Sequence, residues 1–354
     1  MTYSGTGFAP AQPEAAPEVA AAVVVEESIN IRDLVIDTVP LCETGNMLPI
    51  GVKLPDEVAR TVGLGVISAA TKTAIDALIA DALKDRNNNY GALAALPGCL
   101  NKAVDTVGDR PTGLLMGQFF ANSASRLFDA FYVNDLVFLS FAIRLKKMKE
   151  LQSQLKQEEI QFKPFDFVMQ VQCADQGCTK TFEPVVDFSG MDVGFVQNLP
   201  ASHRIEVTLP APFRLYEGTP QEELITHLHF SPTATLRNLK KMLDLQVSME
   251  QKDTEYRMSP TAMSVLSYIM DIPESPSMGS GRHWNLRLWH AMTENPANLG
   301  YLTKVLKKLD KIGAQVQIPL VCPCNRKFAW KGTVPWIDLA NFWYSAAFGD
   351  SDEL

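Results

Sequence analysis

Residues 165–188, FDFVMQVQCADQGCTKTFEPVVDF, carry the pattern on which the predicted fold depends. Apolar and polar residues alternate up to Cys173, a short polar segment follows, and a second alternating run begins after Cys178. Alternation with a period of two is typical of strands with one buried face. The pattern therefore predicts two antiparallel strands joined by a tight turn, with both cysteines at that turn.

Residues 314–336, AQVQIPLVCPCNRKFAWKGTVPW, repeat this layout around a second cysteine pair. Two such hairpins facing each other would place four thiolates at the corners of a tetrahedron, which is how a structural zinc site is built. We therefore predict that Cys173, Cys178, Cys322 and Cys324 share one structural metal ion. The predicted ion is Zn2+, and iron is the other ion that four thiolates accept.

The spacing of the cysteines leaves two other interpretations open. The first pair is C-x4-C, within the usual range for zinc sites, whereas the second is C-x-C, one residue short. The cysteines could instead be small, partly buried hydrophobic residues, or form disulfides, which are rare inside cells. Metal binding is favoured because Lys180, Arg326 and Lys327 follow the pairs and would offset the charge of the thiolates. Cys42 has no cysteine near it in sequence and is expected to be packed.

The length, composition and net charge of the chain exclude several classes of protein. A chain of 354 residues with 46% hydrophobic residues can form two or three domains with substantial cores. The net charge of −8 and the pI of about 5.3 argue against a general nucleic-acid binder. We expect neither a signal peptide nor a membrane span, because glutamates flank the short apolar run 19–25 and no run approaches ~20 residues. A soluble protein, cytosolic when made, is the expectation.

The predicted fold class is α+β and helix-rich, with a small antiparallel β module whose two cysteine-bearing hairpins form a zinc-ribbon-like site. Five segments are expected. They are a leader that is disordered or orders on a partner (1–28), strands plus a helical domain (29–160), the first cysteine hairpin and a β segment (161–230), a helical segment (231–312), and the second cysteine hairpin, packed on the first and followed by an aromatic and acidic tail (313–354).

Individual elements follow from turn and capping chemistry. The predicted elements are a hairpin turning at 43–46, helices at 55–84, 112–131 and 136–159, and two shorter helices opening at Ser231 and Ser259. Asn134 and Asp135 are expected to cap the helix at 136–159. Its second half keeps leucine and methionine at heptad-like spacing, so it either packs on another subunit as a short coiled coil or lies as a solvated helix on its own domain.

Catalytic motifs are missing from the sequence. It contains no H-E-x-x-H, G-x-S-x-G, Walker or dinucleotide-binding pattern. His227 and His229 would lie on one face of a strand and could bind a metal, although this spacing is more often packing or surface. We predict a protein that is not an enzyme, and a metal-dependent hydrolase using these two histidines is the most distant alternative.

Two binding classes remain. The basic and aromatic cluster of Arg326, Lys327, Phe328, Trp330 and Lys331 is compatible with a zinc-ribbon nucleic-acid-binding protein. Structural assembly is the class that we favour. The chain combines a flexible leader, several amphipathic helices and a pair of hairpins that a metal ion is predicted to link. The aromatic tail at residues 342–348 is typical of a terminus that inserts into a neighbouring subunit.

Four short motifs resemble the baseplate hub and hub-assembly proteins of contractile-tailed, T-even-like bacteriophages. The motifs are VPLCETGNMLP at 39–49, Asn134-Asp135-Leu136 leading into FAIRLKK, the strands around Cys173 and Cys178, and WIDLANFW at 336–343. The resemblance covers roughly residues 35–190 and the last forty. It implies a structural virion protein of the tail baseplate, made in the host cytoplasm. The implied partners are other tail and baseplate proteins and copies of itself, with no membrane and no nucleic acid expected.

Overall fold

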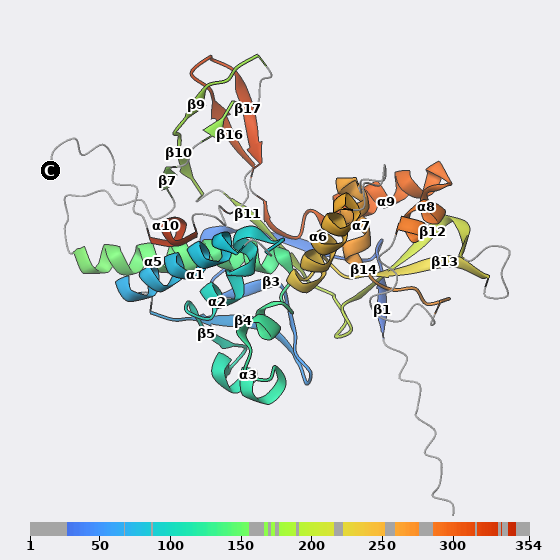
Figure 1. Cartoon of the computed structure of the whole chain (residues 1–354), viewed down its shortest axis with the longest axis horizontal. Helices are drawn as coiled ribbons and strands as arrows, with labels where there is room; N and C mark the ends of the chain where they lie inside the picture. The colour runs from blue at the N-terminus through green and yellow to red at the C-terminus, as the bar shows by residue number, and fades with distance from the viewer. Residues whose placement is uncertain are drawn as a thin grey trace, which may run out of the picture.

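The structure is a computed structural model of the chain. It describes residues 27–66, 68–85, 88–155, 166–168, 171–173, 177–188, 191–215, 222–251, 259–275, 286–315, 317–331, 334 and 339–344. These residues form a mixture of helices and several small sheets, most of whose strand pairs are antiparallel. In Figure 1, strands β9, β16 and β17 project from the rest of the molecule.

The first sheet has the order β3-β4-β5-β6, and each neighbouring pair in it is antiparallel. Its strands are β3 (Met47–Lys53), β4 (Val58–Leu64), β5 (Val104–Val107) and β6 (Arg110–Pro111). The elements around it are η1 (Leu41–Glu43), α1 (Ala69–Lys84), η2 (Gly91–Ala94), α2 (Leu96–Leu100), α3 (Thr112–Phe119), α4 (Ala124–Phe128) and α5 (Val133–Leu155). Ile75, Leu115 and Phe128 are fully buried in one core between these elements.

A second core lies against the sheet β1-β12-β13-β14. Its strands are β1 (Ser28–Asn30), β12 (Arg204–Leu215), β13 (Glu223–Phe230) and β14 (Ile269–Asp271). The helices of this part are α6 (Leu236–Gln251), α7 (Pro260–Tyr268), α8 (Leu286–Thr293) and α9 (Pro296–Leu309). Alternation along β12 turns Ile205, Val207 and Leu209 inward, which is why this strand has one buried face.

A three-stranded antiparallel sheet, β15-β11-β2, brings distant parts of the chain together. It consists of β2 (Ile36–Pro40), β11 (Asp192–Val196) and β15 (Gly313–Gln315). The approach is close at Gly194, where a Cβ atom would lie 1.9 Å from the carbonyl oxygen of Lys311. Strands β7–β10 follow α5 in the chain and β16 follows β15, so this sheet sets the positions from which both cysteine hairpins start.

The cysteine hairpins form the projecting module. The first contains the antiparallel pairs β7 (Asp166–Val168) with β10 (Val185–Asp187), and β8 (Val171–Gln172) with β9 (Thr181–Phe182). The second is β16 (Gln317–Val321) paired with β17 (Lys327–Lys331), and α10 (Leu339–Tyr344) follows it. Both hairpins were predicted from sequence and are confirmed.

Arg144 of α5 attaches the base of this module to the core. Its guanidinium is buried, donates to the carbonyl oxygen of Phe342 at 2.6 Å and to that of Asp166, and lies over the Phe167 ring at 4.8 Å. Burial lowers the pKa of Arg144 to about 10, and the nearby Asp166 opposes this shift. One side chain therefore joins helix α5, the start of the first hairpin and helix α10.

Several predicted elements are wrong. No hairpin turns at 43–46, because β2 pairs with β11 while β3 pairs with β4. The helix at 55–84 is replaced by strand β4 followed by α1, since residues 58–64 pair with β3 and β5 and bury Ala59, Val62 and Leu64. The helix at 112–131 is divided into α3 and α4, because Ala121 and Asn122 adopt positive φ angles of 49° and 58°.

The helix openings were predicted with mixed success. Ser259 caps α7 as predicted by accepting a hydrogen bond from the Ala262 amide at 3.1 Å. Ser231 does not open a helix, because α6 starts at Leu236. Asp135 does not cap α5 but lies inside its first turn. The heptad-like stripe of α5 has Met148 buried within this chain, which favours packing on its own domain over a coiled coil.

Some predictions concern residues outside the described ranges. They include most of the leader (1–26), the end of the helix at 156–159, Asp175 and Gln176 of the first cysteine turn, His283, and the tail at 345–354. The division into five segments stays a prediction, although the first core draws residues from four of those segments.

Candidate metal centre

The two hairpins place their cysteines through backbone pairing at the strand ends. Cys173 follows β8, and its amide donates to the carbonyl oxygen of Lys180 at 3.1 Å, which closes the first hairpin around the turn. Cys322 follows β16, and its amide donates to the carbonyl oxygen of Arg326 at 2.9 Å. The partner cysteines, Cys178 and Cys324, lie in the turns themselves.

The second turn explains how the short C-x-C spacing still presents two thiols to one point. Asn325 adopts a left-handed conformation with φ 66°, and its amide donates to the carbonyl oxygen of Cys322 at 2.7 Å. The Cys324 amide lies 3.5 Å from the sulfur of Cys322 and donates to it. Asparagine tolerates this conformation better than most residues, so the chain can reverse direction in a tight turn directly after Cys324.

The sulfur positions fit a four-coordinate metal. The Cys173 and Cys324 sulfurs are 3.9 Å apart, the Cys178 and Cys322 sulfurs are also 3.9 Å apart, and all four lie within 4.8 Å of one another. A regular tetrahedron with zinc–sulfur bonds of about 2.3 Å has edges of about 3.8 Å. Disulfide bonding requires about 2.05 Å, and all four cysteines are free. The four cysteines could therefore hold one metal ion.

The four cysteines are partly shielded from solvent. Cys173 and Cys322 are buried, Cys178 and Cys324 are half-buried, and Leu320 is buried beside them in sequence. The rings of Phe182 and Phe328 meet edge to face across the two hairpins at a centroid distance of 6.3 Å. This aromatic pair is an apolar contact between the two hairpins, and it is too small to form a core by itself.

The pKa values of the two thiols in the second turn are shifted in opposite directions. Hydrogen bonding from the Arg326 amide lowers the pKa of Cys324 to about 7, and the Cys322 thiol assists this shift. Burial raises the pKa of Cys322 to about 12, and the neighbouring thiols add to this increase. One thiolate therefore forms readily while the next is opposed, because like charges would lie within 4.8 Å. A divalent cation removes this conflict by neutralising the thiolates together.

The basic residues predicted to offset the thiolate charge are on the module. Lys180, Arg326 and Lys327 are all exposed, and each follows a cysteine pair by two or three residues. Because these charges are exposed, their influence on the thiolates is screened by salt.

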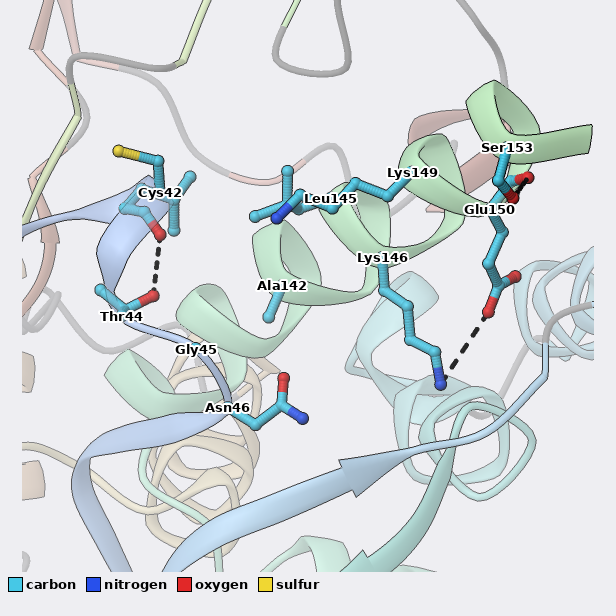
Figure 2. A pocket seen from close by; sticks show the side chains of 11 residues that line it. Cys42, Thr44, Gly45, Asn46, Ala142, Leu145, Lys146, Lys149, Glu150 and Ser153 are labelled. Atoms are coloured by element: carbon cyan, nitrogen blue, oxygen red, sulfur yellow. Dashed lines mark hydrogen bonds and ion pairs between the residues drawn. The ribbon is translucent and has the colours of Figure 1, made fainter. Parts of the chain in front are cut away.

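The other two cysteines do not join the cluster. Cys99 is buried in the first core, where burial raises its pKa to about 12 and keeps the thiol protonated. Cys42 is exposed, so the expectation that it is packed is wrong. It borders a cavity of ≈ 430 Å³ between η1 and α5 (Figure 2). The Lys146 and Glu150 side chains pair with each other there at 3.9 Å.

His227 and His229 lie on strand β13 and are each held by a carboxylate. The Nδ1 atom of His227 is 2.7 Å from Glu274, and that of His229 is 2.6 Å from Asp271. Burial opposes ionisation of Asp271, but the hydrogen bond from His229 and the charge of Arg204 hold its pKa below the ordinary value. Within the described ranges, the four cysteines are the one group of His, Cys, Asp and Glu side chains gathered closely enough to hold a metal ion.

Sequence reasoning missed the role of two buried polar side chains, Asp135 and His203. Asp135 is fully buried, accepts hydrogen bonds from the Ile50 and Gly51 amides at 2.9 and 3.0 Å, and has its pKa raised to about 7 by burial. The Nδ1 atom of buried His203 is 2.9 Å from the Tyr132 hydroxyl. A carboxylate directly before the apolar run 136–143 was the available signal, and it was interpreted as a helix cap.

Helix length and composition were also compared with the needs of a bilayer. None of the helices in the described part of the chain combines the length and apolar content that a membrane span requires. Comparison with known proteins returned no matching family model, no matching curated protein and no matching solved structure.

Proposed function

We propose that this chain is a structural, non-enzymatic protein of a bacteriophage tail baseplate, and that one zinc ion at Cys173, Cys178, Cys322 and Cys324 fixes its projecting module. The observation that carries the proposal is the arrangement of four sulfurs within 4.8 Å of one another on two hairpins that, among the described residues, share no strand pairing. The phage assignment has its support in the sequence resemblance, and the metal assignment in the sulfur geometry.

A structural role for the ion follows from the ligand set. Structural zinc sites have four protein ligands, whereas catalytic zinc keeps one position for water or substrate. Four cysteines supply all four positions here, which leaves the ion no open position. The resulting zinc-ribbon-like module would hold together two chain segments separated by 151 residues, counted from Cys173 to Cys324.

An assembly role has support in the surface of the module. Val168 and Val185 form a cross-strand pair and are 42% and 59% exposed, and Val321 on the second hairpin is 55% exposed. The module projects from the rest of the chain (Figure 1). Apolar side chains on a projecting, metal-fixed element suit a subunit contact in a virion, with copies of the chain or other baseplate proteins as partners.

The test of assembly is the molar mass in solution. Light scattering after size-exclusion chromatography should give a multiple of the 39.1 kDa chain mass, alone or with co-expressed tail proteins. Val185→Lys should reduce this mass, and Leu114→Lys, which changes another exposed apolar residue outside the module, should not. A monomer under all these conditions would contradict the assembly role while leaving the metal site intact.

The exposed basic residues of the module favour one second candidate, a zinc-ribbon nucleic-acid-binding protein. Lys180, Arg326 and Lys327 are exposed on the same module as the cysteines. Binding to a fluorescent oligonucleotide that weakens with salt and is reduced by Arg326→Gln would support this candidate. The net charge of −8 weighs against it.

A further inference from the structure

Helix α9 presents a lysine groove that the proposed function does not use. The groove is lined by Leu34, Ile36, Lys304, Lys307, Lys308 and Lys311, and encloses ≈ 490 Å³. Lys304, Lys307 and Lys308 lie at helical spacing on one face of α9. Lys311 follows in the turn after the helix ends at Leu309. The two aliphatic residues lie on the segment that runs from β1 into β2.

The lysines of the groove are not equivalent. Lys308 is engaged, because its ammonium donates to the carbonyl oxygens of Ile31 at 2.7 Å and Arg32 at 3.0 Å. Within the described part of the chain, Lys304, Lys307 and Lys311 form no ion pair with a carboxylate. Three uncompensated positive charges thus surround an apolar floor in a chain whose net charge is −8.

This combination selects the chemistry of the occupant. Phosphate backbones need positive charge but gain little from an aliphatic floor, whereas an acidic peptide with aliphatic side chains satisfies both the lysines and the floor. Charge complementarity therefore favours a peptide that carries carboxylates at either side of a short aliphatic run.

The chain contains such a peptide in residues 13–27, PEAAPEVAAAVVVEE. Glutamates stand at 14, 18, 26 and 27, valines stand at 19 and 23–25, and no lysine or arginine occurs before Arg32. The described chain begins at Glu27, whose carbonyl oxygen accepts a hydrogen bond from Ser202. The end of this peptide therefore lies seven residues from Leu34 in the floor of the groove.

We propose that the α9 lysine groove binds residues 13–26 of this protein, the valines against Leu34 and Ile36 and the glutamates beside the free lysines. The proposal depends neither on the metal site nor on the phage assignment. An acidic leader held in this groove would either fold back on its own chain or join two copies.

The test is zero-length carbodiimide coupling of the full-length chain, followed by peptide mass spectrometry. Coupling is expected between Glu18 or Glu26 and Lys304, Lys307 or Lys311 at 50 mM NaCl, and should decline strongly at 1 M NaCl because the pairs are screened. Mixing unlabelled and nitrogen-15 chains distinguishes binding within one chain from binding between copies. Coupling of the leader glutamates to Lys84 and Lys102, which are exposed elsewhere, at the same frequency would overturn the proposal.

A charge variant supplies the matched control. The double variant Lys304→Gln, Lys307→Gln leaves Lys311 as the reporter. Coupling at Lys311 should fall roughly fivefold, because two of the three lysine charges that hold the leader are removed and each exposed pair is weak. Lys84→Gln with Lys102→Gln removes the same charge and should leave this coupling unchanged. If the groove variant instead weakens binding of a fluorescent oligonucleotide and no leader coupling occurs, the groove is a phosphate site and the proposal is wrong.

Discussion

Removal of the metal should loosen the projecting module and leave both cores folded. The stems of the hairpins are anchored independently of the cysteines, because Phe167 packs 5.1 Å from Phe342 and Gln315 pairs with Asp192. A metal ion bound by all four cysteines would add the link between the two turns. We therefore expect metal-free protein to open locally at the ends of the hairpins.

The size of this effect follows from the length of chain that the metal closes. From Val168 to Cys173 and from Gln315 to Cys324 the chain runs about 14 residues in total. A cross-link closing a loop of about 15 residues contributes about 3 kcal/mol of chain entropy. Since 1.4 kcal/mol is a factor of ten, opening of the hairpin ends should become about 100-fold more frequent without metal.

Hydrogen exchange measured by mass spectrometry reports this opening directly. Peptides that contain the Cys173 and Cys322 amides, both hydrogen-bonded within their hairpins, should exchange about 100-fold faster after treatment with a chelator and reductant. Peptides that contain the Ile50 and Gly51 amides, bonded to Asp135, serve as the internal reference and should not change. Unchanged exchange in the hairpins of demonstrably metal-free protein, or equal acceleration at the reference peptides, would refute this reasoning.

Three further predictions concern buried positions in the rest of the fold. Arg144→Lys should lower the free energy of unfolding by about 3 kcal/mol in urea titration, because a lysine cannot keep both carbonyl contacts and the ring stacking; a loss below about 0.5 kcal/mol would contradict the anchoring role. His203, whose pKa is lowered by burial from 6.5 to about 4, should reduce stability as the pH falls from 6.5 towards 4, because the unfolded chain takes up the proton first. The stability advantage of wild type over His203→Asn should therefore shrink by about 3 kcal/mol across that interval, and a constant difference would exclude a neutral buried imidazole. Gly194→Ala should cost about 2 kcal/mol, because its Cβ would meet the Lys311 carbonyl oxygen, while Gly300→Ala, with open space around it, should not destabilise the protein, and equal effects would remove the packing argument.

The cysteine hairpins were predictable because their signals are local. Each hairpin is encoded by alternation and by a turn within about 25 residues, and both were found where expected. No local pattern predicts that Cys173 and Cys324 lie close together. This contact was predicted only because four thiols in two turns are a suitable ligand set for one metal ion. The sheet β15-β11-β2, which sets the starting positions of the hairpins, has no signal in sequence, because its strands come from three distant segments.

Strand β4 shows why predictions from local sequence signals were wrong in other parts of the chain. The helix predicted at 55–84 would place Asp56 and Glu57 in its first turn, where acids complement the positive end of the helix dipole. In the structure both bind Arg110, at 2.8 and 2.6 Å, and they form the turn between β3 and β4. The partner lies 54 residues from Asp56, so only the tertiary fold reveals what these acids do.

Asp135 was misinterpreted for the same reason. A carboxylate at the start of a helix usually caps that helix, but this one accepts hydrogen bonds from two amides of strand β3. The contact joins residues 85 and 84 positions apart in the chain. Sequence patterns identify which polar groups are available, and long-range packing decides which of them meet.

The most direct test of the shared metal site is the metal content of purified protein measured by elemental analysis. We predict one zinc ion per chain in the wild type, loss of the ion in Cys173→Ser and in Cys322→Ser, and full retention in Cys42→Ser. The two sensitive variants lie on different hairpins, so equal loss from both requires that the hairpins bind the same ion. Retention of zinc in both of these variants, or a metal-free wild type purified without chelator, would contradict the account.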